Sequence, residues 1–157
     1  YSDNEAMALL MKNFPTDDLY RIYGELGISN PYQNDGNVIS VKDYASFFRI
    51  LYNAAYLTQT DSEKALSLLA QSNFRAGLVA GVPDNVPVAH KFGERELGEG
   101  NYRQQMHDCG IIYYEKYPYL LCVMTRGQDE DKLVDIIKNV SRITFEEIAR
   151  NYPDDTK

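Results

Sequence analysis

The spacing of apolar residues changes along the chain, and this change most constrains the fold. Up to residue 81, apolar residues recur three and four positions apart, as on one face of a helix. Residues 82–126 hold the apolar runs of strands, and helical spacing returns over 127–152. Helices, antiparallel strands and a closing helix predict an α+β fold. We expect one domain over residues 1–157, with a helical half, a three-stranded antiparallel sheet and a C-terminal helix.

Several helix ends are marked by residues that suit them. A Ser or Thr at a helix start caps a free backbone N–H, and an acid three positions later supports the cap. Pro15 and Gly27 are predicted to end the first two helices. The predicted starts are Ser2 with Glu5, Thr16, Ser40 with Asp43, and Thr60 with Glu63.

The three predicted strands leave both edges of their sheet uncovered. The first begins near Val86 or Val88, and the others span 106–114 and 119–125, which a short turn makes antiparallel neighbours. Unpaired strand edges invite pairing with further chain. We expect either that part of the fold lies upstream of Tyr1 or that the chain self-associates through an exposed sheet edge.

The two cysteines fall on the second and third predicted strands. If Tyr114 pairs with Tyr119, Cys109 lies diagonally from Cys122 on the same face of the sheet. Diagonal neighbours lie ~7–8 Å apart, beyond comfortable reach of a disulfide. We therefore expect two free, buried thiols.

Composition excludes several kinds of partner. The net charge of −7 argues against affinity for nucleic-acid backbone. No apolar run approaches the ~20 residues that a helix needs to span a bilayer. The cysteines show no metal-ligand spacing, and consecutive His107 and Asp108 point to opposite faces of a strand. We expect no metal, no other cofactor and a small-molecule or peptide substrate.

The two histidines have structural interpretations. His90 precedes Lys91 on the predicted strand, so the two side chains point to opposite faces, and His90 is expected in the core or an interface. His107 and Asp108 are expected to fix the end of a strand.

Two short motifs accompany these elements. S-D-N at residues 2–4 opens the first predicted helix, and K-F-G at residues 91–93 lies on the first predicted strand. Each triplet alone is common. In this order, and together with the stretches VPVAHKFGE, HDCGIIYYEKYPYLLCVMTRG and VSRITFEEI, they resemble class A β-lactamases and penicillin-binding proteins. The resemblance covers Tyr1 to about Tyr152, and it implies the C-terminal portion of a larger serine-hydrolase domain.

The resemblance implies roles around an acyl-enzyme. In such enzymes a serine attacks an amide or lactam carbonyl, and a second hydroxyl carries a proton to the leaving nitrogen. By resemblance, Ser2 is this hydroxyl, Asn4 binds the substrate's amide side chain and orients the nucleophile's lysine, and Lys91 supplies positive potential beside Ser2 and the substrate carboxylate. Gly93 and Glu94 belong to the substrate site, where the backbone N–H of Glu94 supplies half of the oxyanion hole.

The sequence departs from the family pattern at two places. Phe92 replaces the Thr or Ser whose hydroxyl contacts the substrate carboxylate, so this part of the substrate site is altered. The deacylating glutamate of the E-x-x-x-N pattern has one weak candidate, Glu25, with Ser29 in place of the Asn. Peptidase-like or slow penicillin-binding activity is therefore at least as well supported as rapid β-lactam hydrolysis. Asp3 is expected to point into the fold as a structural residue.

The family nucleophile is an S-x-x-K serine, and no Ser, Thr or Cys in the sequence has a Lys three positions later. The resemblance then implies a nucleophile upstream of Tyr1 and a chain that is inactive alone. It also implies a bacterial protein outside the cytoplasm, periplasmic or secreted, because the family's substrates lie in the cell wall. The alternative is a non-catalytic α+β binding or interaction domain derived from that fold.

Overall fold

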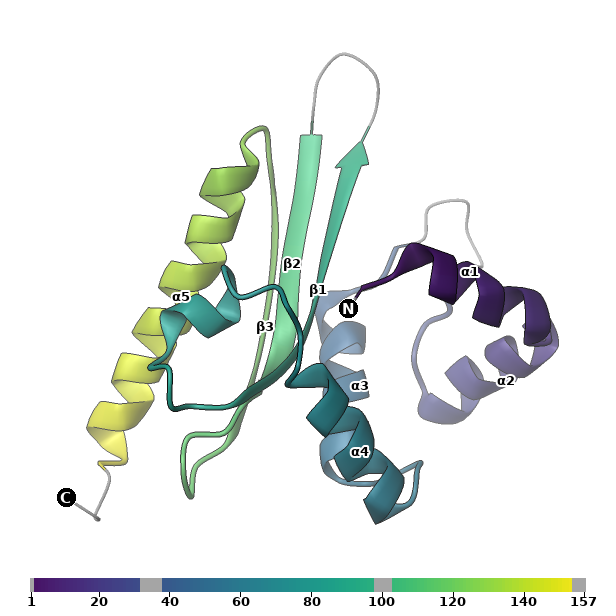
Figure 1. Cartoon of the computed structure of the whole chain (residues 1–157), viewed down its shortest axis with the longest axis horizontal. Coiled ribbons are helices and arrows are strands. Elements are labelled where there is room, and N and C mark those ends of the chain that lie inside the picture. Colours follow the sequence, from purple (N-terminus) through teal and green to yellow (C-terminus); the bar gives the residue numbers. More distant parts are fainter. Residues whose placement is uncertain (1, 32–37, 98–102, 154–157) are drawn as a thin grey trace.

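A computed structural model describes residues 2–31, 38–97 and 103–153 of the chain, and Figure 1 shows its arrangement of helices around one sheet. The elements are the helices α1 Asn4–Asn13, α2 Thr16–Leu26, α3 Val41–Tyr52, α4 Gln59–Leu69 and α5 Glu130–Asn151, the short 3-10 helix η1 Leu78–Gly81, and the strands β1 Val88–Leu97, β2 Arg103–Ile112 and β3 Tyr119–Gly127.

The sheet separates two layers of helices. Its strands are antiparallel in the order β1-β2-β3. Helices α5 and η1 cover one face, α3 and α4 cover the other, and α1 and α2 lie beyond them on the side away from α5 (Figure 1). The predicted α+β architecture is confirmed. None of the helices in the described ranges has the length and apolar character needed to span a membrane.

Each face of the sheet has its own hydrophobic core. On the α5 face, Leu78, Ile112 and Ile137 have no exposed surface. On the α3 face, Phe48 and Leu66 pack against Ala89, Cys109 and Ile111 of the strands. Neighbouring residues of one strand therefore serve different cores, as the two-residue period of a strand requires.

A buried polar network crosses the α5 side of the sheet. The Asp108 carboxylate, which has no exposed surface, accepts a hydrogen bond from the Leu78 backbone N–H at 3.0 Å and lies 2.8 Å from Nδ1 of His90. Ser141 of α5 donates to the Leu78 carbonyl at 2.7 Å. His90 is 1% exposed, so its predicted core location on the face opposite Lys91 is confirmed. These bonds join α5, η1, β1 and β2 behind the strand that carries Lys91.

The predicted register of β2 and β3 is wrong by two residues. Tyr119 pairs with Ile112 and not with Tyr114, because the connection between the strands is longer than a tight turn. Cys109 and Cys122 are therefore direct partners with Cα atoms 4.0 Å apart, and they form a disulfide. The expectation of two free thiols was wrong for this reason.

Most helix ends lie close to their predicted positions. The hydroxyl of Ser40 caps α3 by accepting from the Asp43 N–H, and Gly27 ends α2 with the left-handed φ of 64° that favours glycine. Helix α4 is capped by Thr58 and not by Thr60, because the Thr58 hydroxyl accepts from the Asp61 N–H. Thr16 does not cap α2 as predicted: it is the first helical residue, Pro15 holds the N-cap position, and no side chain caps this helix.

Candidate functional site

The S-D-N and K-F-G motifs meet at the edge strand β1. Lys91 Nζ donates a hydrogen bond to Ser2 Oγ at 2.8 Å, although the two residues are 89 positions apart. Lys91 Nζ also donates to the carbonyl of Phe92. Half-buried Lys91 thus joins the start of α1 to the first strand of the sheet.

Asp3, and not Ser2, caps α1. One oxygen of its carboxylate accepts from the backbone N–H groups of Glu5 at 2.9 Å and Ala6 at 3.0 Å. The expectations of a Ser2 cap and of an inward-pointing Asp3 were therefore both wrong. Both residues suit the N-cap position. With Asp3 in that position, the Ser2 hydroxyl is available to Lys91.

A cleft of about 570 Å³ opens between α1 and β1. The six residues that the sequence assigns to the site all contribute to its walls: Ser2, Asn4, Lys91, Phe92, Gly93 and Glu94. The remaining lining residues are Asp3, Ala6, Met7 and Leu10. The structure thus brings the predicted site residues together, while their catalytic roles stay predictions.

Burial is the main influence on the Lys91 ammonium. It lowers the pKa of Lys91 below the ordinary lysine value, because a charge loses solvation when it leaves water. The negative charges of Asp108 and, less strongly, Glu94 oppose this shift. Lys91 is therefore a cation whose solvation is only partly replaced by neighbouring carboxylates.

Tyr44 of α3 supports β1 at the position of Lys91. Its hydroxyl donates to the Lys91 backbone carbonyl at 2.7 Å. Burial and, less strongly, the Asp108 charge raise the pKa of Tyr44, so the phenol stays protonated and remains a donor. The sequence analysis assigned no role in the site to Tyr44. The signal was its hydroxyl, since a buried tyrosine usually finds a hydrogen-bond partner.

His107 fills the space beneath Gly93. A Cβ atom at position 93 would lie 2.7 Å from His107 Nε2, so the strand and the ring approach closely because residue 93 is glycine. The His107 ring also contacts Tyr44 edge-on, with centroids 6.3 Å apart. Burial, followed by the charge of Lys91, lowers the pKa of His107. A neutral imidazole therefore supports the backbone of Gly93 from below.

The ring of Phe92 lies beside the Lys91 ammonium. Lys91 Nζ is 4.8 Å from the centroid of this ring, within the range of a cation–π contact. The ring also stacks on Phe74, with centroids 4.3 Å apart and planes inclined by 22°. Phe74 was not predicted as part of the site, and no signal in the sequence marks it.

Glu25 is not part of this cleft. Its exposed carboxylate accepts from the Tyr56 hydroxyl at 2.6 Å and from Arg21 at 2.6 Å. The hydrogen bond from Tyr56, followed by that from Arg21, lowers the pKa of Glu25. A carboxylate occupied in this way, outside the cleft lining, does not support the deacylating role considered for Glu25.

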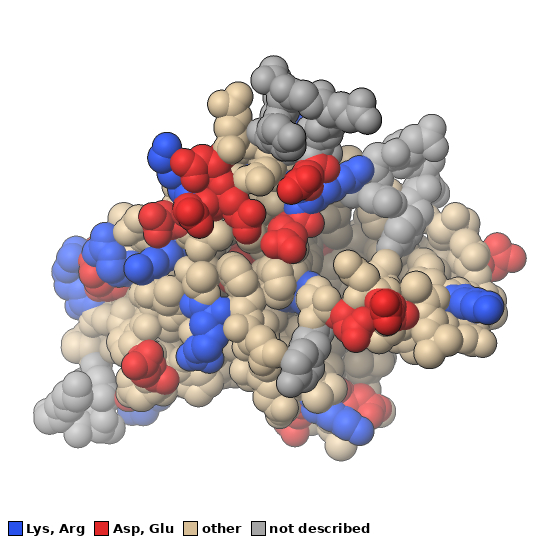
Figure 2. Space-filling model, turned by 45° about the horizontal axis from the view of Figure 1, so that its top comes forward, with Lys and Arg blue, Asp and Glu red and all other residues tan. Residues whose placement is uncertain are grey.

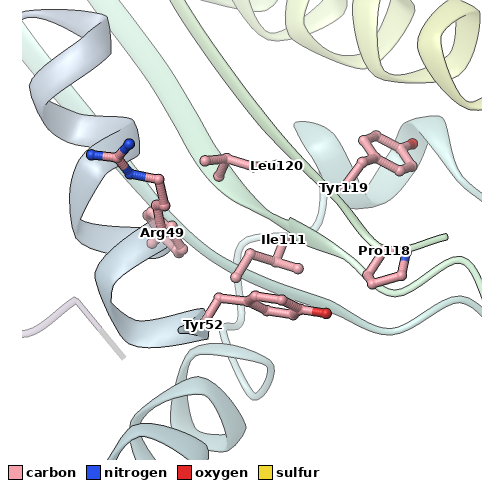
Figure 3. A pocket seen from close by; sticks show the side chains of 7 residues that line it. Arg49, Tyr52, Ile111, Pro118, Tyr119 and Leu120 are labelled. Atoms are coloured by element: carbon pink, nitrogen blue, oxygen red, sulfur yellow. The ribbon is translucent and has the colours of Figure 1, made fainter. Parts of the chain in front are cut away.

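A second hollow of about 170 Å³ lies between α3 and the ends of β2 and β3. Figure 3 shows Ile111 between the rings of Tyr52 and Pro118, with Leu120 nearby and the Tyr119 ring farther away. Arg49 is its one charged lining residue, and Figure 3 shows the guanidinium turned away from Ile111. None of the residues that the sequence assigns to the site lines this hollow.

The comparisons with known proteins agree with the motifs. The model of the β-lactamase enzyme family matches residues 1–148. The chain belongs to this family. A comparison with curated proteins finds no match. No group of three or more His, Cys, Asp or Glu side chains that would hold a metal ion occurs within the described residues.

Solved structures of β-lactamases and of PBP-A share the fold at low sequence identity. The TLA-3 extended-spectrum β-lactamase matches with a TM-score of 0.81 and 17% identity, over 94% of this chain and 60% of its own. A β-lactamase from Sphaerobacter thermophilus matches with 0.79 and 19%, over 95% and 59%. A variant of PBP-A, solved as an acyl-enzyme complex with penicillin G, matches with 0.69 and 18%, over 85% and 52%. The chain thus spans about half to three fifths of these structures.

Proposed function

We propose that this chain is part of a serine hydrolase that cleaves an amide bond of a β-lactam or of a D-Ala-terminated peptide through an acyl-enzyme. The hydrogen bond from Lys91 to Ser2 at the cleft carries this proposal. Membership of the β-lactamase family and the fold of PBP-A, captured as a penicillin acyl-enzyme, support it.

In the proposed acylation, a serine outside these 157 residues attacks the substrate carbonyl carbon. Its oxygen forms the new ester bond, and the carbon–nitrogen bond breaks. The proton of the attacking serine hydroxyl passes through the Ser2 hydroxyl to the leaving nitrogen. The ammonium of Lys91 donates to Ser2 Oγ, so the hydrogen of that hydroxyl is free to point toward the nitrogen. Ser2 thus acts as a proton shuttle with a defined direction.

The other cleft residues hold the substrate in this proposal. The Glu94 backbone N–H contributes to the oxyanion hole, next to Gly93, whose lack of a side chain lets the His107 ring lie against the strand. The Asn4 side chain, on the first residue of α1, binds the substrate's amide. Tyr44 and His107 act as positioning residues, since they fix the backbone of β1 at Lys91 and Gly93.

Hydrolysis of the acyl-enzyme is proposed to be slow. The described residues that line the cleft include one carboxylate beyond the helix cap, Glu94 at the exposed rim, while Glu25 is bonded elsewhere. Such a protein forms long-lived adducts with β-lactams, as a penicillin-binding protein does, instead of destroying them rapidly.

We also propose a location outside the cytoplasm, periplasmic or secreted. Family resemblance implies it, because the substrates lie in the cell wall. The Cys109–Cys122 disulfide supports it, since disulfides persist mainly in oxidising compartments.

The test is labelling of the complete protein, nucleophile included, with a fluorescent penicillin. We expect a covalent adduct whose formation slows about 10²-fold or more in Ser2→Ala and in Lys91→Ala, the usual range for a lost proton-transfer group. Ser29→Ala and Lys64→Ala make the same changes at exposed positions outside the cleft and should label at the parent rate.

The rival function predicts a different result. A folded complete protein that forms no adduct would be a non-catalytic binding domain. One that labels equally fast after both cleft substitutions would overturn the roles proposed for Ser2 and Lys91. The motivating observation for this rival is Phe92, whose ring lies beside the ammonium at the position where the family has a hydroxyl.

A further inference from the structure

Asp108 is a buried carboxylate on the strand next to that of Lys91. In the register of the sheet it is the partner of Phe92, the residue that follows Lys91. Its side chain has no exposed surface, accepts a backbone N–H of η1 at 3.0 Å and lies 2.8 Å from Nδ1 of His90. A Cβ atom at Gly77 would lie 2.5 Å from its Oδ2, so the carboxylate is closely packed as well as bonded. Asp108 is therefore held in one place beside the backbone of β1.

The buried carboxylate has no cationic partner at the pH where a lysine titrates. A histidine is neutral at alkaline pH, so His90 does not cancel the negative charge there. Within the described residues, no lysine or arginine forms an ion pair with Asp108, and no carboxylate forms one with Lys91. The two opposite charges therefore act on each other at a distance, through the interior of the fold.

The medium between two charges decides how strongly they interact. Figure 2 shows other acidic side chains gathered toward the top of the face that is turned forward, where water and salt screen their charges. Asp108 acts instead through packed protein, in which the effective dielectric constant is ~20 and not ~80. In agreement, the charge of Asp108 raises the pKa of Lys91 more strongly than that of Glu94, which lies at the exposed rim of the cleft.

The other ionisable groups that face Lys91 are neutral or exposed. Tyr44 of α3 keeps its proton because burial raises its pKa, and burial likewise keeps His107 of β2 neutral. Asp3 and Glu94 are exposed carboxylates at the cleft. Helices α4 and η1, which are described over their whole length, bury no ionisable residue.

We propose that Asp108 is a positioning residue: its buried charge keeps Lys91 protonated, and the ammonium keeps the Ser2 hydroxyl oriented as a proton shuttle. An ammonium has no lone pair, so it can only donate to Ser2 Oγ. A neutral amine could accept instead, and the Ser2 hydrogen would then point to Lys91 and away from a substrate. The role in catalysis rests on the proposed acyl-transfer function, whereas the effect on Lys91 does not.

The direct test is a titration of Lys91 in the complete protein. Lysines labelled with ¹³C at Cε are followed by NMR between pH 7 and 11, and the Lys91 signal is identified by its loss in Lys91→Arg. We expect Asp108→Asn to move this titration to lower pH by roughly one unit, the effect of one charge at ~12 Å with an effective dielectric constant of ~20. Charges of the protein outside these 157 residues act alike on parent and variant, so the difference isolates Asp108.

Three comparisons decide the origin of the shift. Ser141→Ala removes another bond of the same buried network without a change of charge and should leave the Lys91 titration in place. Glu94→Gln removes a rim charge and should shift it less than Asp108→Asn. In the parent protein, a rise in salt from ~0.05 to ~0.5 M should change it by far less than one unit, because a buried pair is screened little. The salt series decides the question even if Asp108→Asn does not fold.

The pH dependence of acylation separates this inference from the proposed function. With the fluorescent penicillin, the alkaline fall in labelling rate should move in Asp108→Asn by the same amount as the NMR titration. A shifted titration with an unchanged rate profile overturns the positioning role. A titration that Asp108→Asn leaves in place, that either comparison variant shifts as far, or that salt lowers by a unit overturns the effect on Lys91 and leaves acyl transfer intact. Absence of any adduct overturns acyl transfer, while the NMR titration still decides whether Asp108 maintains the charge of Lys91.

Discussion

The two ends of the chain form helices with very different surroundings. Helix α5 buries Leu133, Ile137 and Ser141 against the sheet and η1. Neither α1 nor α2 contains a buried residue, although α1 has the apolar side chains of a packed helix. Met7, Leu9 and Leu10 of α1, and Phe14 directly after it, are between 41% and 70% exposed.

The difference shows that the candidate site lies between a firmly packed part and a loosely held part. Lys91 is on β1, whose backbone is fixed by Tyr44 in front and by the His90–Asp108 pair behind. Ser2 precedes α1, which gains little packing from the other described residues. The distance from Lys91 to Ser2 therefore depends on what holds α1 in place.

The largest expected difference concerns apolar burial in the two parts. Ile137→Ala removes a fully buried side chain of α5 and should lower the free energy of unfolding by about 2–5 kcal/mol. Leu10→Ala, a similar truncation on exposed α1, should change it by less than about 0.5 kcal/mol. Urea denaturation of the two variants measures both. Equal losses would show that α1 is packed as firmly as α5.

The next largest effect concerns an Asp→Asn substitution in the firmly packed part and in the loosely held part. In Asp108→Asn, an NH₂ group replaces one carboxylate oxygen, either the one that accepts from the Leu78 N–H or the one that faces His90. This substitution should lower the free energy of unfolding by about 1–3 kcal/mol. Asp3→Asn keeps a good cap on α1 and should be nearly neutral. Thermal unfolding distinguishes them, and a destabilising Asp3→Asn would mean that the α1 start is strongly coupled to the fold.

A smaller effect should be visible at high pH. Burial raises the pKa of Tyr119 on β3 to about 12. Its folded form holds the proton longer than the unfolded chain, so this contribution to stability is complete below pH ~10 and is lost as the pH rises toward 12. Urea midpoints between pH 8 and 11 should decline less steeply in Tyr119→Phe. Tyr20→Phe, at an exposed residue of α2, should leave the slope unchanged.

The smallest effect is expected at the contact between α2 and the loop before α4. Glu25→Gln weakens the hydrogen bonds from Tyr56 and Arg21, but all of these groups are exposed, and exposed ion pairs contribute little. The urea midpoint should stay within experimental error of the parent. A clear decrease would identify this contact as the main attachment of α2.

The sequence predicted the features that depend on local chemistry. Ser40 caps α3, Gly27 ends α2, and β1 begins at Val88, because caps, glycines and apolar periods act within a few residues of themselves. The motif pair at Ser2 and Lys91 was also visible, since the family resemblance supplied the link between distant segments.

The sequence could not predict features that depend on distance in three dimensions. The register that pairs Cys109 with Cys122 follows from the length of a connection whose conformation no local signal fixes. Asp3 and Ser2 are equally good caps, and a lysine 89 residues beyond Ser2 engages its hydroxyl. The bond from Tyr44 to the Lys91 carbonyl likewise joins a helix and a strand 47 residues apart.

The capping of α1 by Asp3 has a consequence for how neighbouring positions vary among related sequences. The helix requires an acceptor at position 3, whereas exposed Ser2 contributes to the described structure through its bond with Lys91. In lineages that no longer use the cleft, selection would retain Asp3 or Asn and release Ser2. In lineages that depend on turnover, both positions would be held. If Ser2 has the proposed role, the ratio of substitution rates at these two adjacent codons records whether the cleft is still in use.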